Sequence, residues 1–224
     1  MRLRVPATTG NTGPGFDATG LAFTLYARFE AQLLEPGRLE IEGCEARYCG
    51  EDNLAVRAFR AVETRAALAP MGLRLRLDTD VPISRGLGSS ATLLVAGAFA
   101  ANELRGRPLS PEELLDIVTD MEGHPDNVAP ALYGGLCAGV RREDGHVLCV
   151  RYPVSPQVRF AALIPDFPLS TALARGVLPQ NVPLRDAIYN LSRAAMLPHA
   201  MRVGDYDLLA QVLDDRLHTP TAAT

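Results

Sequence analysis

The chain contains no lysine, because all 22 of its basic residues are arginine. This absence excludes chemistry that needs a lysine amine, such as Schiff-base catalysis or the lysine of a Walker-type phosphate loop. The basic residues form no run of five or more, and the formal net charge is -4. A nucleic-acid partner bound through bulk positive charge is therefore not expected.

Cysteines and long apolar segments are also scarce. The four cysteines form no C-x-x-C pair and no zinc-binding spacing, so reduced and mostly buried thiols are expected. The longest apolar run, at 93–101, is far shorter than the roughly 18 residues of a membrane span. The first arginines are not followed by the apolar stretch of a signal peptide. We therefore expect a soluble, cytoplasmic protein with no membrane partner.

The composition is that of an ordinary globular protein, with 47% hydrophobic and 21% charged residues. The length of 224 residues suits one domain or two small ones. A proline-containing stretch at 153–156 is the best candidate for a boundary. We predict an N-terminal domain at 1–154 and a partial C-terminal domain at 155–224.

Strands and helices alternate along the chain. Apolar patterning predicts strands at 21–34, 73–78, 147–152 and 159–164. Helical spacing predicts helices at 53–69, 89–104, 111–122, 184–203 and 206–217, the third opened by a capping box of Ser110 and Glu113. A helix pair needs a sheet to cover, and one strand is not a sheet, so the C-terminal half is expected to be incomplete.

The segment 82–91 joins a predicted strand to a predicted buried helix and has the sequence PISRGLGSSA. Gly86 and Gly88 can adopt positive φ and let backbone N–H groups approach an anion. Ser89 and Ser90 stand where the helix begins, with its unpaired N–H groups and the positive end of its dipole. The segment predicts a phosphate-binding loop, and the alternative is a glycine-rich turn with a serine cap.

Three motifs carry a resemblance to a known family. The string P-x-x-x-GLGSSA resembles the nucleotide-binding motif of the GHMP small-molecule kinases. The string VPATTGN, followed by GPGFD, resembles the N-terminal segment of homoserine kinases, and EGHPDNVAPA resembles their central motif. The match covers about residues 5–220 with the motifs in the family's order. The resemblance implies an α+β GHMP kinase fold, in which an N-terminal mixed α/β domain of ribosomal-protein type precedes a ferredoxin-like α/β domain, here incomplete, with the active site between them.

The resemblance also implies ATP as the phosphoryl donor, L-homoserine as the acceptor and Mg²⁺ as the cofactor, in threonine biosynthesis. The metal contacts fall on Ser90 and Glu122, for which the alternative is a solvated carboxylate at a helix end. Phosphoryl transfer needs alignment and charge stabilisation more than covalent help. The nucleotide-binding positions carried over are Asn53, Pro82, Ile83, Ser84, Arg85, Gly86, Leu87, Gly88, Ser89, Ser90, Ala91 and Thr92.

Homoserine offers an ammonium, a carboxylate and a hydroxyl group. Asn11 and Asp17 match positions that hold the ammonium, while His124 and Asn127 lie in a polar turn near the hydroxyl or amine. Thr171 and Arg175 match the positions that bind the carboxylate, for which a bidentate arginine is suited. The catalytic set implied is Asn11, Asp17, Asp126 and Arg175. The alternatives are turn formers that bond their own backbone and a surface arginine.

The chain departs from the family's pattern after residue 218. Relatives continue with a segment that holds a second arginine for the carboxylate and have a third, glycine-rich motif, whereas this chain reads TPTAAT at 219–224. We therefore expect weak Mg·ATP binding and little or no homoserine phosphorylation. A non-catalytic remnant and a GHMP kinase for another small alcohol are the alternatives, and a homodimer and a general base are left open.

Overall fold

The computed structural model of the chain describes residues 1–83, 85–164, 176 and 178–219. Its centre is a six-stranded sheet in which the order is β3-β4-β2-β5-β6 and β1 pairs with β2. The strands are β1 (Arg2–Thr9), β2 (Thr19–Leu34), β3 (Leu39–Glu42), β4 (Gly72–Thr79), β5 (Leu136–Arg141) and β6 (Val147–Tyr152). All neighbouring strands are antiparallel except β3 and β4, which are parallel.

The long strand β2 organises the sheet. Its second half pairs with β4 from Ala27 to Leu34, and its first three residues pair with β5. Phe29 of β2 and Leu75 of β4 are buried, and alternate residues on both strands share this burial, as the period of two in a strand requires. The register of β1 on β2 shifts between Pro6 and Thr8, just before the chain leaves the sheet.

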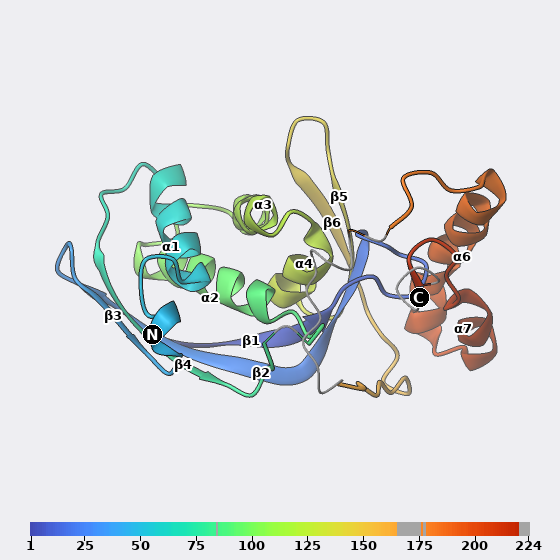
Figure 1. Cartoon of the computed structure of the whole chain (residues 1–224), viewed down its shortest axis with the longest axis horizontal. Coiled ribbons are helices and arrows are strands. Elements are labelled where there is room, and N and C mark those ends of the chain that lie inside the picture. Colours follow the sequence, from blue (N-terminus) through green and yellow to red (C-terminus); the bar gives the residue numbers. More distant parts are fainter. Residues whose placement is uncertain (84, 165–175, 177, 220–224) are drawn as a thin grey trace.

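Four helices cover one face of the sheet: α1 (Leu54–Arg65), α2 (Ser89–Leu104), α3 (Pro111–Glu122) and α4 (Pro125–Tyr133) (Figure 1). Helix α2 is buried on most sides and packs closely on α1. A Cβ atom at Gly97 of α2 would lie 1.9 Å from the carbonyl oxygen of Ala55 in α1, so only glycine allows this approach. The main apolar core lies between these helices and the sheet.

Two further helices, α6 (Leu184–Val203) and α7 (Tyr206–Val212), stand beyond the β5–β6 hairpin (Figure 1). They share a second, smaller apolar cluster that includes Leu197 and Leu209 and reaches Leu21 and Leu136 of the sheet. None of the described helices has both the length and the apolar character needed to cross a membrane. The predicted boundary between residues 154 and 155 stays a prediction.

The structure corrects several details of the prediction. Residues 159–164 form no strand, because no described strand lies beside them to complete a ladder. Helix α7 ends at Val212 rather than at residue 217. Of the four cysteines, Cys137 is buried and the others are partly exposed. The helices α1, α2, α3 and α6 and the strands β2, β4 and β6 were predicted, whereas β1, β3, β5 and α4 were not.

Helix α4 was missed because Pro130 lies inside it, and an interior proline is unfavourable in a helix. Pro130 has no N–H to donate to the carbonyl group of Asp126, four residues earlier. That carbonyl is approached instead by Gly20 of β2, where a Cβ atom would lie 1.6 Å from the oxygen. The helix thus packs closely on a distant strand, a contact that the local sequence does not reveal.

Candidate active site

The predicted phosphate loop connects β4 to α2, as expected. Leu87 is buried, and its carbonyl oxygen accepts a hydrogen bond from the backbone N–H of Thr8 at 3.2 Å. Gly88 is the N-cap of α2 and provides no side-chain cap, whereas Asn53 caps α1 and Ser110 caps α3. The first N–H groups of α2 therefore keep their capacity to bind an anion.

Two features of the structure, the backbone conformation and the packing, require glycine at position 88. Its φ angle of +64° lies in the left-handed region, and a Cβ atom there would lie 2.0 Å from Thr8 Oγ1. The same Cβ would lie 3.2 Å from Asn127 Oδ1. Gly86 shares the positive φ, at +72°, but a Cβ atom there would have nothing within 4 Å. A larger residue would therefore clash with Thr8 at position 88, whereas position 86 has room for a side chain.

Ser90 and Glu122 lie together at the beginning of α2 and the end of α3. The Ser90 hydroxyl donates a hydrogen bond to Glu122 Oε1 at 2.7 Å. Adjacent ligands of an octahedral Mg²⁺ ion lie about 2.9 Å apart, given metal–oxygen distances of about 2.0–2.1 Å. The two oxygens, both hard ligands, fit neighbouring positions of such an ion, which would keep water at its other positions.

A polar cluster lies beside the phosphate loop and is centred on Asp126. This residue is in the first turn of α4 and is 1% exposed. Its carboxylate accepts a hydrogen bond from the Asn11 backbone N–H at 3.2 Å and contacts His124 Nδ1. One potential ligand atom from each of Asp17, His124 and Asp126 lies within 4.8 Å of the others. Two carboxylates so close together favour a bound cation, such as an ammonium group.

The loop that follows β1 holds Asn11 and Asp17 in unusual backbone conformations. Their φ angles are +56° and +53°, in the left-handed region where asparagine and aspartate are tolerated better than most residues. The Asn11 side-chain oxygen accepts a hydrogen bond from the Asp17 backbone N–H at 2.8 Å. A Cβ atom at Gly10 would lie 1.9 Å from Asp126 Oδ2, so the loop rests directly on the cluster.

A cavity of 580 Å³ opens between the phosphate loop and the C-terminal helices. Thr9, Arg85 and Leu87 line it on the side of the phosphate loop. Phe160 and Tyr206 are among the residues that line the opposite side. The cavity therefore lies next to the residues that precede the start of α2.

The remaining predicted site residues divide into three groups. Asn53 is buried and used locally, since its side chain accepts from Ala55 N–H and donates to the Tyr48 carbonyl, both at 2.9 Å. Pro82 is half-buried and Ile83 exposed ahead of the helix, whereas the Ala91 and Thr92 side chains are buried in α2. The residues outside the described part of the chain are Ser84, Thr171 and Arg175.

Thr8 is a site residue that the sequence analysis did not select. Its hydroxyl donates to Asn127 Oδ1 at 2.9 Å, and its backbone N–H binds the phosphate loop. Thr8 therefore connects the polar cluster to the start of α2. It stands within the string VPATTGN, so the motif contained a signal, but its role depends on contacts across the fold.

The chain is similar to known proteins over nearly its whole length. Residues 53–135 match the model of the GHMP kinases N-terminal domain. The homoserine kinase of Clostridium botulinum (strain Loch Maree / Type A3) is 43% identical over 218 residues, covering 97% of this chain and 73% of that protein. The homoserine kinase of Moorella thermoacetica is 45% identical over 225 residues, covering 97% and 74%. The crystal structure of homoserine kinase from Cytophaga hutchinsonii superposes with a TM-score of 0.82 at 27% identity, covering 99% and 73%.

Proposed function

The chain belongs to the homoserine kinase family of the GHMP kinases, and we propose that it transfers the γ-phosphate of ATP to the side-chain hydroxyl of L-homoserine. The observation that supports this proposal most strongly is that a site suited to phosphate lies next to a site suited to an ammonium group. The uncapped start of α2 favours a bound phosphate, and the polar cluster centred on Asp126 favours an ammonium group. Thr8 contacts both of them. A substrate with an amine and a hydroxyl can thus lie next to a bound nucleotide.

In this proposal the nucleotide phosphates bind at the segment 82–92. The N–H groups of Ser89 and Ser90 and the dipole of α2 supply positive potential that no lysine can supply. Arg85, which lines the cavity, adds a permanent positive charge. Ser90 and Glu122 would hold Mg²⁺, which when bound neutralises charge on the phosphate oxygens.

The amino acid binds on the other side of Gly88 and Thr8. Asp17 and Asp126 attract the ammonium group, Asn11 and His124 orient the Asp126 carboxylate, and Asn127 lies beside the hydroxyl. Thr171 and Arg175 are proposed, from the motif alone, to bind the carboxylate. The hydroxyl oxygen attacks the γ-phosphorus, the bond to the β–γ bridging oxygen breaks, ADP leaves and the hydroxyl proton passes to water. Alignment and charge neutralisation lower the barrier.

The test is a product assay with Mg·ATP and several alcohols. We expect L-homoserine to give ADP and O-phospho-L-homoserine, identified by mass spectrometry, faster than L-serine or mevalonate. Asp17→Asn should raise the KM for homoserine, and Asp78→Asn, an exposed aspartate on the outer sheet face, is the matched control. A faster reaction with another alcohol would reject homoserine as substrate. Stabilisation by Mg·ATP without turnover of any alcohol would instead identify a non-catalytic nucleotide binder.

A further inference from the structure

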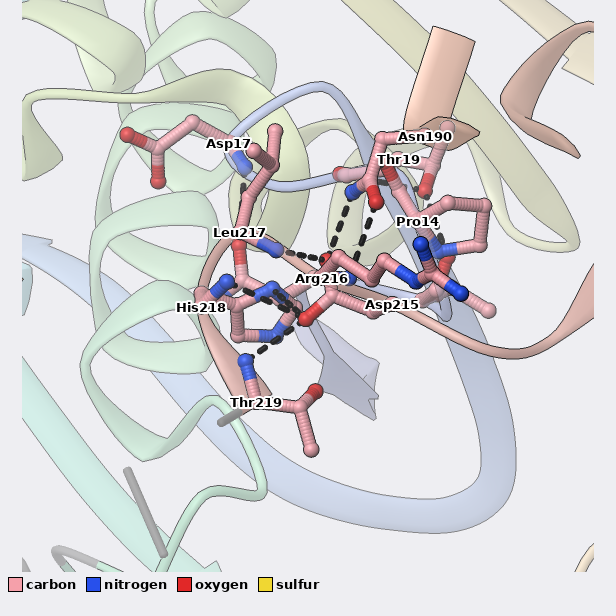
Figure 2. A network of polar contacts seen from close by, with 12 residues as sticks. Pro14, Asp17, Thr19, Asn190, Asp215, Arg216, Leu217, His218 and Thr219 are labelled. Atoms are coloured by element: carbon pink, nitrogen blue, oxygen red, sulfur yellow. Dashed lines mark hydrogen bonds and ion pairs between the residues drawn. The ribbon is translucent and has the colours of Figure 1, made fainter. Parts of the chain in front are cut away.

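The loop that carries Asp17 is held from outside by the C-terminal helices (Figure 2). Asn190, a buried residue of α6, donates from Nδ2 to the Pro14 carbonyl at 3.3 Å and to Asp215 Oδ1 at 2.6 Å. Its Oδ1 accepts from the backbone N–H of Arg216 at 2.9 Å. One amide side chain therefore joins the loop to the segment that follows α7.

Asp215 is the centre of that segment. It is 6% exposed and accepts hydrogen bonds from the backbone N–H groups of Leu217 at 3.0 Å, His218 at 3.1 Å and Thr219 at 2.6 Å. The Nδ1 atom of His218 also lies 2.9 Å from Asp215 Oδ2. A buried carboxylate with so many donors fixes the backbone around it, because leaving those donors without an acceptor would be costly.

The fixed segment contacts the loop at other points as well. The rings of His218 and Phe16 pack with their centroids 5.1 Å apart. A Cβ atom at Gly13 would lie 3.2 Å from the carbonyl oxygen of Leu213. The residues immediately before Asp17 are thus supported at Pro14 and Phe16 by the network built around Asp215, and at Gly13 by the end of α7.

We propose that Asp215 is a positioning residue for the acceptor substrate. It orders the segment 215–219 and Asn190, these support residues 13–16, and the loop in turn places Asp17 against the polar cluster. A loop with left-handed residues depends on surrounding contacts to hold its conformation, as Asn11 and Asp17 illustrate. This inference rests on the proposed binding of the ammonium group by Asp17, and it adds a role for a residue that lies outside the site.

The test uses Asp215→Asn, which keeps the size of the side chain but replaces one acceptor oxygen by an NH2 group, a donor that would face other donors. We expect the KM for homoserine to rise about tenfold or more, since small displacements of positioning groups have large effects. The affinity for Mg·ATP should change less than twofold, because α2 lies on the other side of the site. Asp214→Asn is the control, since this neighbouring exposed residue accepts from Tyr189 rather than supporting the loop.

Asn190→Ala provides a second test in case Asp215→Asn does not fold, because it removes the bridge to Pro14 and keeps the backbone donors of Asp215. Equal weakening of homoserine and ATP binding, or a lower melting temperature with unchanged KM, would show that the network only stabilises the fold. Hydrogen exchange in the ligand-free protein tests the inference without activity: residues 13–18 should exchange faster in both variants, and α2 should not. Unchanged exchange would overturn the inference, whereas a faster reaction with an alcohol other than homoserine would reject the proposed function alone.

Discussion

The two parts of the molecule are held together in different ways. In the first part, helix α2 is buried between α1, α3 and the sheet, and most of its apolar residues are inaccessible. In the second part, α6 leaves Leu184, Ile188 and Leu191 exposed and has a small apolar cluster. Its connection to the substrate loop is polar and runs through Asn190 and Asp215. Apolar burial thus builds the scaffold, and directional hydrogen bonds place the second part against the site.

The largest effect is expected at the phosphate loop in the first part. Gly88→Val places a branched side chain at positive φ and against Thr8, so ATP binding should be lost and stability should fall by about 1–3 kcal/mol. Isothermal titration with Mg·ATP measures the binding. Gly106→Val, at the other end of α2, is the control: its φ is +87° and its Cβ site has nothing within 4 Å. Equal ATP affinity in the two variants would remove the phosphate loop from the proposed site.

The second prediction compares the stability cost of replacing a buried leucine in the first part and an exposed leucine in the second part. Leu94 in α2 is 1% exposed and Leu191 in α6 is 71% exposed. Leu94→Ala should lower the free energy of unfolding by about 2–5 kcal/mol because it leaves a cavity in the core. Leu191→Ala should change it by less than about 0.5 kcal/mol. Urea unfolding followed by circular dichroism decides the matter, and a cost above 1 kcal/mol for Leu191→Ala would mean that this face of α6 is covered in solution.

A smaller effect is expected at the metal position, which lies wholly within the first part. Glu122→Gln removes the charge of the proposed ligand while keeping its hydrogen bond to Ser90, so the Mg²⁺ concentration for half-maximal activity should rise about 10–100-fold. Glu112→Gln, at the exposed start of the same helix, is the control. A Mg²⁺ dependence that Glu122→Gln leaves unchanged would place the metal elsewhere.

The smallest effect concerns the polar connection and depends on pH. Burial pushes the pKa of Asp215 up, but hydrogen bonds from Asn190, Thr219 and Leu217 outweigh it and hold this pKa well below its usual value. The unfolded carboxyl group takes up a proton below about pH 4, while the folded one stays ionised to lower pH. Stability from Asp215 is therefore present above pH 4 and is lost as the pH falls further.

Urea unfolding at pH 6 and pH 3 tests this linkage. The unmodified chain should lose more stability between these two pH values than Asp215→Asn, by about 1 kcal/mol, because pH 3 lies about one unit below the pKa of the unfolded carboxyl group and each unit is worth about 1.4 kcal/mol. Asp78→Asn serves as a surface control. Parallel pH profiles for the unmodified chain and Asp215→Asn would show that the carboxylate is not held in its ionised form by the fold.

Local signals in the sequence account for much of the scaffold. The capping box of Ser110 and Glu113 opens α3 as predicted, with both reciprocal hydrogen bonds present. Alternating leucines mark β4, and the glycines before Ser89 mark the start of α2. Each of these features depends on residues within a few positions of one another, so short-range physical rules are sufficient to predict them.

Other features depend on contacts between distant segments. Residues 159–164 have a strand-like pattern but no described partner strand, and α4 contains Pro130 and packs closely on Gly20 of β2. In each case a partner far away in the chain, or its absence from the described residues, decides the outcome.

The sequence by itself therefore determined the chemical groups of the site and the order in which they occur along the chain. The tertiary structure alone decided that Asp126 is buried against the loop of Asn11 and Asp17, that Thr8 joins this cluster to α2, and that Asp215 supports the loop from the far end of the chain. The physical reason is that hydrogen bonds and charges act over a few ångströms, and only folding brings residues more than 100 positions apart to that distance.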